Sequence, residues 1–136
     1  MSTPGVTAEF IARVLLQAGF WLPLAVCTYL ALTPSPPESL FRLSDMLLHG
    51  FAFTYLTFAL GTAHRLRRWW YAALWMLAYG LFIEAMQSFE PARTAELKDM
   101  ATNMVGIALG LLGLRFISDW VRDVAVRMVA IVIRNP

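Results

Sequence analysis

Four hydrophobic segments constrain this chain most, because each has the length of a membrane-spanning helix. We predict these segments at residues 11–32, 44–63, 69–89 and 99–116. A helix rises about 1.5 Å per residue, so about twenty residues cross a hydrocarbon core of about 30 Å. Backbone groups in lipid must be hydrogen-bonded within the protein, which favours helices over isolated strands. The predicted fold is therefore all-α, an integral membrane four-helix bundle.

The composition agrees with a membrane protein. Of the 136 residues, 59% are hydrophobic and 15% are charged, whereas a soluble domain is roughly 45–50% apolar and about 25% charged. The net charge of +2 decides little about partners, and we predict no nucleic-acid partner. The single cysteine, Cys27, can form neither a disulfide framework nor a thiolate metal cluster within one chain. We predict one transmembrane domain over residues 1–116 and a separate segment over residues 117–136.

The basic residues predict the orientation of the helices, because Lys and Arg concentrate on the cytoplasmic side of membrane proteins. Eight of the eleven basic residues fall on one side if both termini are cytoplasmic: Arg13, Arg65, Arg67, Arg68, Arg115, Arg122, Arg127 and Arg134. We therefore predict a multi-pass protein of the cytoplasmic (inner) membrane with both termini inside (N-in/C-in). The C-terminal segment is predicted to be an amphipathic helix at the inner interface, with a partner-binding segment as the alternative. His64 is interpreted as a solvated loop residue.

Three of the segments carry a pair of polar residues near one end. The six residues are Asp45, His49, Glu84, Gln87, Asp99 and Asn103. The members of each pair are three or four positions apart and therefore share one helix face. In the predicted topology all six lie in the outer third of the membrane, where the three faces converge on one pocket. An ionisable group at the bilayer centre costs about 2.5–3.5 kcal/mol or more, so such groups usually face a bundle interior and mark function.

Two further features accompany these pairs. Arg93 follows Pro91 in the connection after the third segment and is expected to hang over the pocket. Gly106 and Gly110, with Gly113 one turn further, let a neighbouring helix approach the fourth segment closely. This spacing predicts tight packing within the chain more than it predicts dimerisation.

The order and spacing of these residues resemble the VanZ-like family of small membrane proteins. In that pattern an aspartate and a histidine open one helix, and a glutamate and a glutamine close the next. A proline and an arginine follow in a loop, and an aspartate, an asparagine and a glycine open a further helix. The matching residues are Asp45, His49, Tyr79, Gly80, Glu84, Gln87, Pro91, Arg93, Asp99, Asn103, Gly106 and Gly110. Met46 and Ala92 depart from the pattern, since the family often has lysine and glycine there.

The resemblance implies a role in the cell envelope, because founding members of the family are linked to low-level resistance to teicoplanin-type glycopeptides. With the polar pocket, it predicts a protein that binds or chemically modifies an amphiphilic substrate, a membrane lipid or a lipid-linked envelope precursor, at the outer leaflet. A membrane-protein partner or a homo-oligomer is compatible with this prediction. The sequence leaves open whether the protein is an enzyme. The alternative is a non-enzymatic membrane subunit or scaffold whose polar residues only join the helices.

Three chemistries fit the pocket. The catalytic candidates are Asp45, His49, Glu84 and Asp99, and the substrate-binding candidates are Gln87, Arg93 and Asn103. In hydrolysis or transfer, Glu84 or Asp99 acts as base, His49 acts as acid, and Arg93 holds an anionic head group. Metal-assisted hydrolysis, with the four catalytic candidates as ligands, lacks a recognised ligand spacing, so we predict no metal and no cofactor. The third hypothesis is capture of a lipid head group without catalysis.

Overall fold

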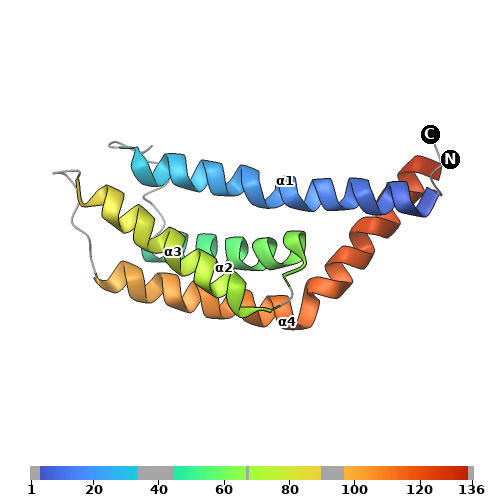
Figure 1. Cartoon of the computed structure of the whole chain (residues 1–136). Helices are drawn as coiled ribbons and strands as arrows, with labels where there is room; N and C mark the ends of the chain where they lie inside the picture. The colour runs from blue at the N-terminus through green and yellow to red at the C-terminus, as the bar shows by residue number, and fades with distance from the viewer. Residues whose placement is uncertain (1–3, 34–44, 67, 90–96, 135–136) are drawn as a thin grey trace.

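The computed structural model describes residues 4–33, 45–66, 68–89 and 97–134, with the side chains of 4, 45, 46, 97 and 98 excepted. The described chain forms four helices and no strand (Figure 1). They are α1 (Pro4–Leu32), α2 (Asp45–His64), α3 (Trp70–Gln87) and α4 (Leu97–Arg134). The prediction of an all-α protein with four helices is confirmed.

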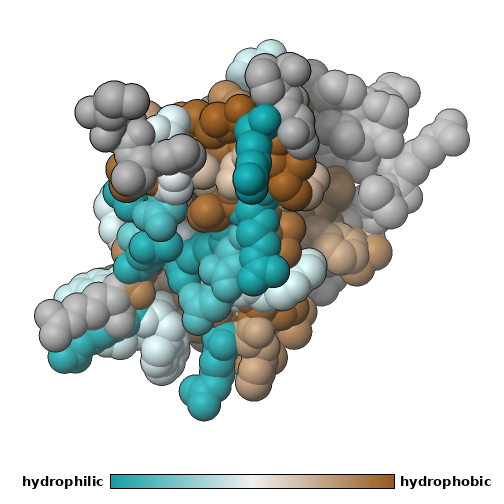
Figure 2. Space-filling model, turned by 90° about the vertical axis from the view of Figure 1, so that its right-hand side faces the viewer, coloured by the Kyte–Doolittle hydropathy of each residue, from teal (hydrophilic) through white to brown (hydrophobic). Residues whose placement is uncertain are grey.

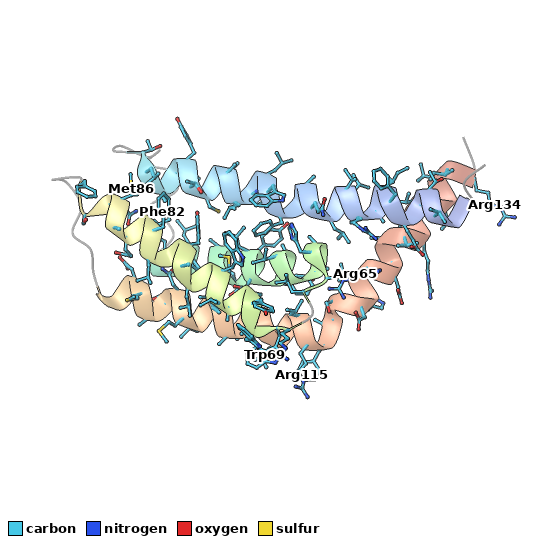
Figure 3. The ribbon with its side chains drawn as sticks, in the orientation of Figure 1. Arg65, Trp69, Phe82, Met86, Arg115 and Arg134 are labelled. Atoms are coloured by element: carbon cyan, nitrogen blue, oxygen red, sulfur yellow. The ribbon has the colours of Figure 1, made fainter. Side chains whose placement is uncertain are left out.

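Two of the helices are longer than the sequence predicted. Helix α1 begins at Pro4 rather than at residue 11, because a proline in the first turn of a helix removes only an amide that has no partner there. Helix α4 continues past residue 116 to Arg134. Figure 1 shows that α4 changes direction near its middle, close to Arg115, which Figure 3 labels. The predicted division of the chain after residue 116 stays a prediction, and the change of direction falls near it.

Helix α2 contacts each of the other three helices and shares its largest interface with α4. Glycines make this interface close. A Cβ atom on Gly106 would lie 2.7 Å from the carbonyl oxygen of Gly50, and one on Gly110 would lie 2.6 Å from that of Thr54. Neither backbone oxygen can move away without breaking its helix. The predicted tight packing of the Gly106-x-x-x-Gly110 face within the chain is confirmed.

A proline within α1 is compensated from α2. Pro23 has no amide hydrogen, so the carbonyl of Gly19 lacks the donor that it would have in a regular helix. The hydroxyl of Tyr55 donates to this carbonyl oxygen at 2.6 Å. The contact satisfies the acceptor that the proline leaves open, and it fixes the position of α1 against α2.

Replacing Tyr55 by Phe is expected to destabilise the protein by about 1–2 kcal/mol, because an acceptor in an apolar environment is left without a donor. Adding Pro23→Ala should recover most of this loss, since the new amide hydrogen can bond to Gly19. Chemical unfolding of the two single variants and the double variant measures the coupling. Tyr29→Phe is the control, because the Tyr29 side chain is 71% exposed. Additive losses would show that the two residues do not share this acceptor.

The exposed surface of the helices is apolar, as α3 illustrates. Its buried residues recur every three or four positions and form one face: Ala72, Met76, Gly80, Ile83 and Gln87. The opposite side carries Leu74, Trp75 and Phe82, which are 57%, 65% and 50% exposed. Large exposed apolar surfaces of this kind mark contact with a membrane or with another protein.

Two ranges, Gly5–Leu32 in α1 and Asp99–Arg134 in α4, are long and apolar enough to cross a membrane. The most apolar windows of these helices are only 11% and 22% buried, whereas the core helix of a soluble protein is mostly buried. The assignment of α2 and α3 as further membrane spans stays a prediction.

The two termini lie at the same end of the molecule (Figure 1), and α2 ends and α3 begins toward that end. We call it the terminal end. Hydrophilic side chains gather there (Figure 2). Arg65 and Arg134 lie toward the terminal end, whereas Phe82 and Met86 lie toward the opposite one (Figure 3). This arrangement agrees with both termini facing one side of the membrane, and which side that is stays a prediction.

Candidate functional site

Three of the predicted catalytic residues come together at the end of the bundle opposite the termini. His49 lies one turn into α2, Glu84 in the last turn of α3, and Asp99 in the first turn of α4. All three are partly buried. The charges of Asp99 and His49 both act electrostatically on the carboxyl group of Glu84. Three helices therefore place the charges of Asp99 and His49 within electrostatic range of the Glu84 carboxyl group. We call these three residues the polar triad.

Two predicted members of this site cannot be placed by their side chains. Asp45 is the first residue of α2 and lies one turn before His49. Its side chain is among those that the structure does not describe. Arg93 lies in the connection between α3 and α4, outside the described residues. Its expected position over the pocket stays a prediction.

Asn103 lies one turn after Asp99 and is buried, with 6% of its surface exposed. Its side-chain amide is close to Gly80: a Cβ on that glycine would lie 3.6 Å from Nδ2 of Asn103. The Oδ1 atom is buried and accepts no hydrogen bond from the part of the chain that the structure describes. Leaving such an acceptor open costs about 1–3 kcal/mol. A buried open acceptor near two carboxyl groups calls for an explanation.

Gln87 makes a hydrogen bond between two helices. Its Nε2 donates to the carbonyl oxygen of Ala31 at 2.9 Å. Ala31 is in the last turn of α1, where carbonyl groups have no partner within the helix. Gln87 thus joins the ends of α1 and α3 beside the polar triad. Its predicted role in substrate binding stays a prediction.

Sequence reasoning gave no role to Tyr79, although the residue belongs to the family pattern. Its hydroxyl is 2.9 Å from Oγ1 of Thr28 on α1, and Thr28 donates in turn to the carbonyl of Leu24 at 2.7 Å. The Tyr79 ring also lies against that of Phe53 on α2, with 5.9 Å between centroids. Tyr79 therefore links three helices beneath the polar triad. Its neighbour Gly80 was the available signal, because a glycine inside a helix marks a close approach.

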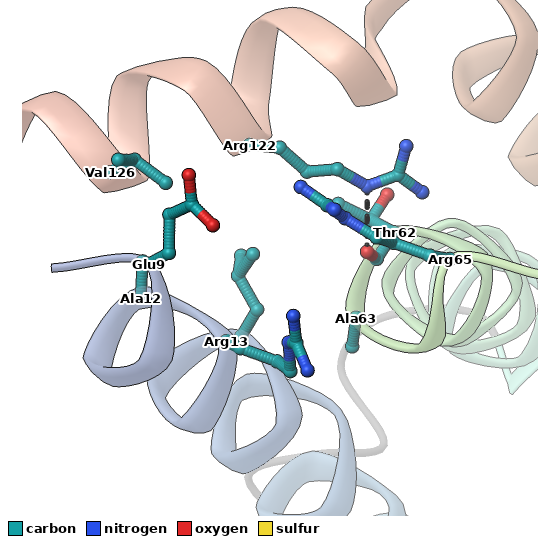
Figure 4. Close-up of a pocket in the computed structure, with 9 residues that line it drawn as sticks. Glu9, Ala12, Arg13, Thr62, Ala63, Arg65, Arg122 and Val126 are labelled. Atoms are coloured by element: carbon teal, nitrogen blue, oxygen red, sulfur yellow. Dashed lines mark hydrogen bonds between the residues drawn. The ribbon is translucent and has the colours of Figure 1, made fainter. Parts of the chain in front are cut away.

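A second group of polar residues, which the sequence did not predict as a site, lies at the terminal end. A cleft there is lined by Glu9, Arg13, Thr62, Arg65 and Arg122, among others (Figure 4). Arg122 donates from Nε to the carbonyl of Thr62 at 2.9 Å and from Nη2 to that of Gly61 at 2.8 Å. These carbonyls lie in the last turn of α2, where helices leave acceptors open.

The interpretation of His64 as a solvated loop residue is wrong. His64 is the last residue of α2 and is partly buried. Its ring packs edge-on against those of Phe20 and Trp21, at centroid distances of 5.6 and 5.9 Å. The aromatic side chains of α1 supply an apolar surface that a reading of the basic loop alone does not reveal.

Within the described residues, no three His, Cys, Asp or Glu side chains are grouped so that they could hold a metal ion. The hypothesis with four metal ligands also includes Asp45, whose side chain lies outside that part.

Fold and surface are those expected of a helical membrane protein. A model of the VanZ/LLP1 family matches residues 9–118. The match covers most of the sequence, and the chain therefore belongs to the VanZ/LLP1 family. The resemblance inferred from the order of polar residues is confirmed at the level of the family. No curated protein and no solved structure matches this chain.

Proposed function

We propose that the polar triad and its neighbours bind the head group of an amphiphile, a lipid or lipid-linked envelope precursor, at the outer leaflet of the cytoplasmic membrane. Through this binding the protein contributes to resistance against glycopeptides, the property to which VanZ-like proteins are linked. Membership of the VanZ/LLP1 family supports the second part. The first part rests on the geometry of the triad.

The observation that carries the proposal is the electrostatic interaction of Glu84 with both Asp99 and His49 across three helices. Two carboxyl groups near each other cannot both ionise cheaply in an apolar environment. Helix packing alone offers little reason to place them there, because interhelical polar contacts in membranes contribute only about 0.6 kcal/mol on average. Two carboxyl groups and an imidazole in one region can serve as an acid and a base.

The open acceptor of Asn103 supports the same function. Oδ1 is buried one turn from Asp99 and has no donor within the described residues. A ligand hydroxyl or amide can supply that donor, as sugar and peptide head groups do. In the catalytic form of the proposal, Glu84 or Asp99 removes a proton, His49 returns one, and Arg93 holds an anionic group. In the non-catalytic form the same residues only hold the head group.

The amide variants Glu84→Gln and Asp99→Asn are expected to keep the fold and to lose function. Each preserves the size and hydrogen-bonding capacity of the side chain but removes its charge. The measurements are thermal unfolding of the purified protein and the teicoplanin susceptibility of a sensitive bacterium that expresses the chain. We expect unchanged unfolding and the loss of most of the resistance that the parent chain confers.

Asp123→Asn is the matched control, because Asp123 is exposed on α4 and far along the chain from the triad. It should keep both stability and resistance. If both triad amides also keep full resistance, the carboxyl groups serve only to join the helices, and the alternative of a non-enzymatic scaffold stands.

A further inference from the structure

The cleft at the terminal end is built from three separate elements. Glu9 and Arg13 come from α1, Thr62 lies in the last turn of α2, Arg65 directly follows α2, and Arg122 comes from α4 (Figure 4). We call it the arginine cleft. It is shallow: the space within it that a water molecule can occupy measures ≈ 20 Å³, which is room for about one water-sized group. A larger group would therefore bind at its mouth.

The positive charge in the arginine cleft is only partly compensated. Arg122 is bound to two carbonyls and to Asp119, whose Oδ1 is 2.7 Å from Nη1. Arg13 and Arg65 make no ion pair or side-chain hydrogen bond with the described part of the chain. Glu9 lines the cleft but forms no ion pair with either arginine. Two guanidinium groups beside a third repel one another unless an anion joins them.

The negative features near the cleft do not cancel this charge. The C-terminal end of α2 carries a partial negative charge, but Arg122 covers two of its carbonyl groups. Asp119 is 94% exposed and already bonded to Arg122. Among the described residues that line the cleft, Glu9 is the one carboxylate.

The backbone of Arg65 is held in an unusual conformation. Its φ angle is +47°, in the left-handed region. This residue directly follows α2, a position that glycine usually occupies because a side chain there is strained. An arginine at this position lines the cleft instead. Strain of this kind collects at functional sites.

One hydroxyl group behind the mouth of the cleft has no partner. Thr62 is 2% exposed, and its Oγ1 has no hydrogen-bond partner in the described chain. Thr62 also lines the cleft, which has room for about one water molecule that can join this hydroxyl to a group at the mouth. The guanidinium groups suit phosphate, because arginine donates two parallel hydrogen bonds to its oxygens.

We propose that the arginine cleft binds a phosphate group, with Arg13 and Arg65 as its main donors. The surroundings suit the phosphate of a membrane lipid, because the cleft lies between α1 and α4, and each of these helices is long and apolar enough to cross a membrane. Acyl chains can lie along the apolar surface of these helices while the phosphate sits at the mouth of the cleft. This site is separate from the polar triad, and its test does not depend on the function proposed for the triad.

The test uses the full chain in micelles of dodecyl maltoside, which carries no phosphate, with or without added phosphatidylglycerol, and measures thermal unfolding. Phosphatidylglycerol should raise the unfolding temperature of the parent protein. Arg65→Gly and Arg13→Gln should each remove at least about half of that rise, because a ligand that binds more weakly stabilises the folded state less. Arg65→Gly is informative because glycine relieves the backbone strain, so its own unfolding temperature without added lipid should be unchanged or higher.

Arg127→Gln is the matched control, since it removes the same charge from an exposed position on α4 that does not line the cleft. It should keep the full response to phosphatidylglycerol. If Arg127→Gln loses as much of the rise in unfolding temperature as Arg65→Gly does, the lipid binds to general surface charge and the site does not exist. A second series titrates inorganic phosphate into the dodecyl maltoside micelles without lipid. A rise that Arg65→Gly abolishes supports the site and identifies soluble phosphate as a ligand. No rise with either probe overturns the proposal.

Discussion

Gly110→Ala is expected to destabilise the protein by about 3 kcal/mol, at the upper end of what overpacking usually costs. The added methyl group would lie 2.6 Å from the carbonyl oxygen of Thr54 and 2.6 Å from Cβ of Thr57. The first atom is part of the α2 backbone, and the second is a side-chain carbon bonded directly to it. Both therefore move only if the two helices separate. Alanine's helix propensity returns about 1 kcal/mol of the loss at most. The measurement is chemical unfolding of the purified protein.

Gly50→Ala is the control within the same interface. A Cβ at residue 50 would meet only the methyl group of Thr102, at an ordinary 3.5 Å. We expect this variant to be as stable as the parent or slightly more so, because alanine favours the helix. Equal stability of the two variants would mean that α2 and α4 are farther apart than the structure has them.

The sequence predicted the helices well because local signals determine them. The predicted bounds of the second and third segments agree closely with α2 and α3. The glycine spacing on α4 predicted a close neighbour, and the structure identifies that neighbour as α2. The sequence could not tell which helix it would be, because small residues permit an approach without specifying the partner.

The pairing of polar residues along helix faces predicted that Glu84 would meet residues of two other helices. Spacings of three or four positions fix a face, and the alternation of helix direction fixes an end. His49 and Asp99 both lie within electrostatic range of Glu84, and their joint role as one functional site stays a prediction. What these residues bind or transform cannot follow from such spacing, because the same groups suit acid–base chemistry and simple capture.

The contacts that the sequence missed all depend on residues far apart in the chain. The hydroxyl of Tyr55 donates a hydrogen bond to the carbonyl oxygen that Pro23 leaves without a donor. The ring of His64 packs edge-on against that of Phe20. Each pairs a local irregularity with a distant side chain. A periodic pattern shows neither, because it describes one helix at a time. Arg122, which reaches from α4 to the last turn of α2, belongs to the same group.

Arg122→Met is expected to destabilise the protein by about 2–4 kcal/mol. The arginine side chain is only 16% exposed and donates to the carbonyl oxygens of Thr62 and Gly61. Hydrogen bonds from charged groups contribute about 1.5–3 kcal/mol each to stability. In the variant, water that reaches the two carbonyl groups can bond to them and so reduces the net loss of stability. Methionine keeps the apolar stem. The loss should appear in chemical unfolding of the purified chain.

Arg122→Lys should not restore stability, because one ammonium group cannot present the two separated donors that reach both carbonyls. Asp119→Asn tests the other partner of Arg122. Asp119 is 94% exposed, and exposed ion pairs contribute about 0–1 kcal/mol, so this variant should be nearly as stable as the parent. The contrast separates the capping of α2 from the surface ion pair.

The Arg122→Met variant also tests the predicted boundary after residue 116, since the two hydrogen bonds of Arg122 cross this boundary. If Arg122→Met unfolds like the parent, the second half of α4 is not held to α2 by this side chain, and residues 117–134 behave as the separate segment that the sequence predicted.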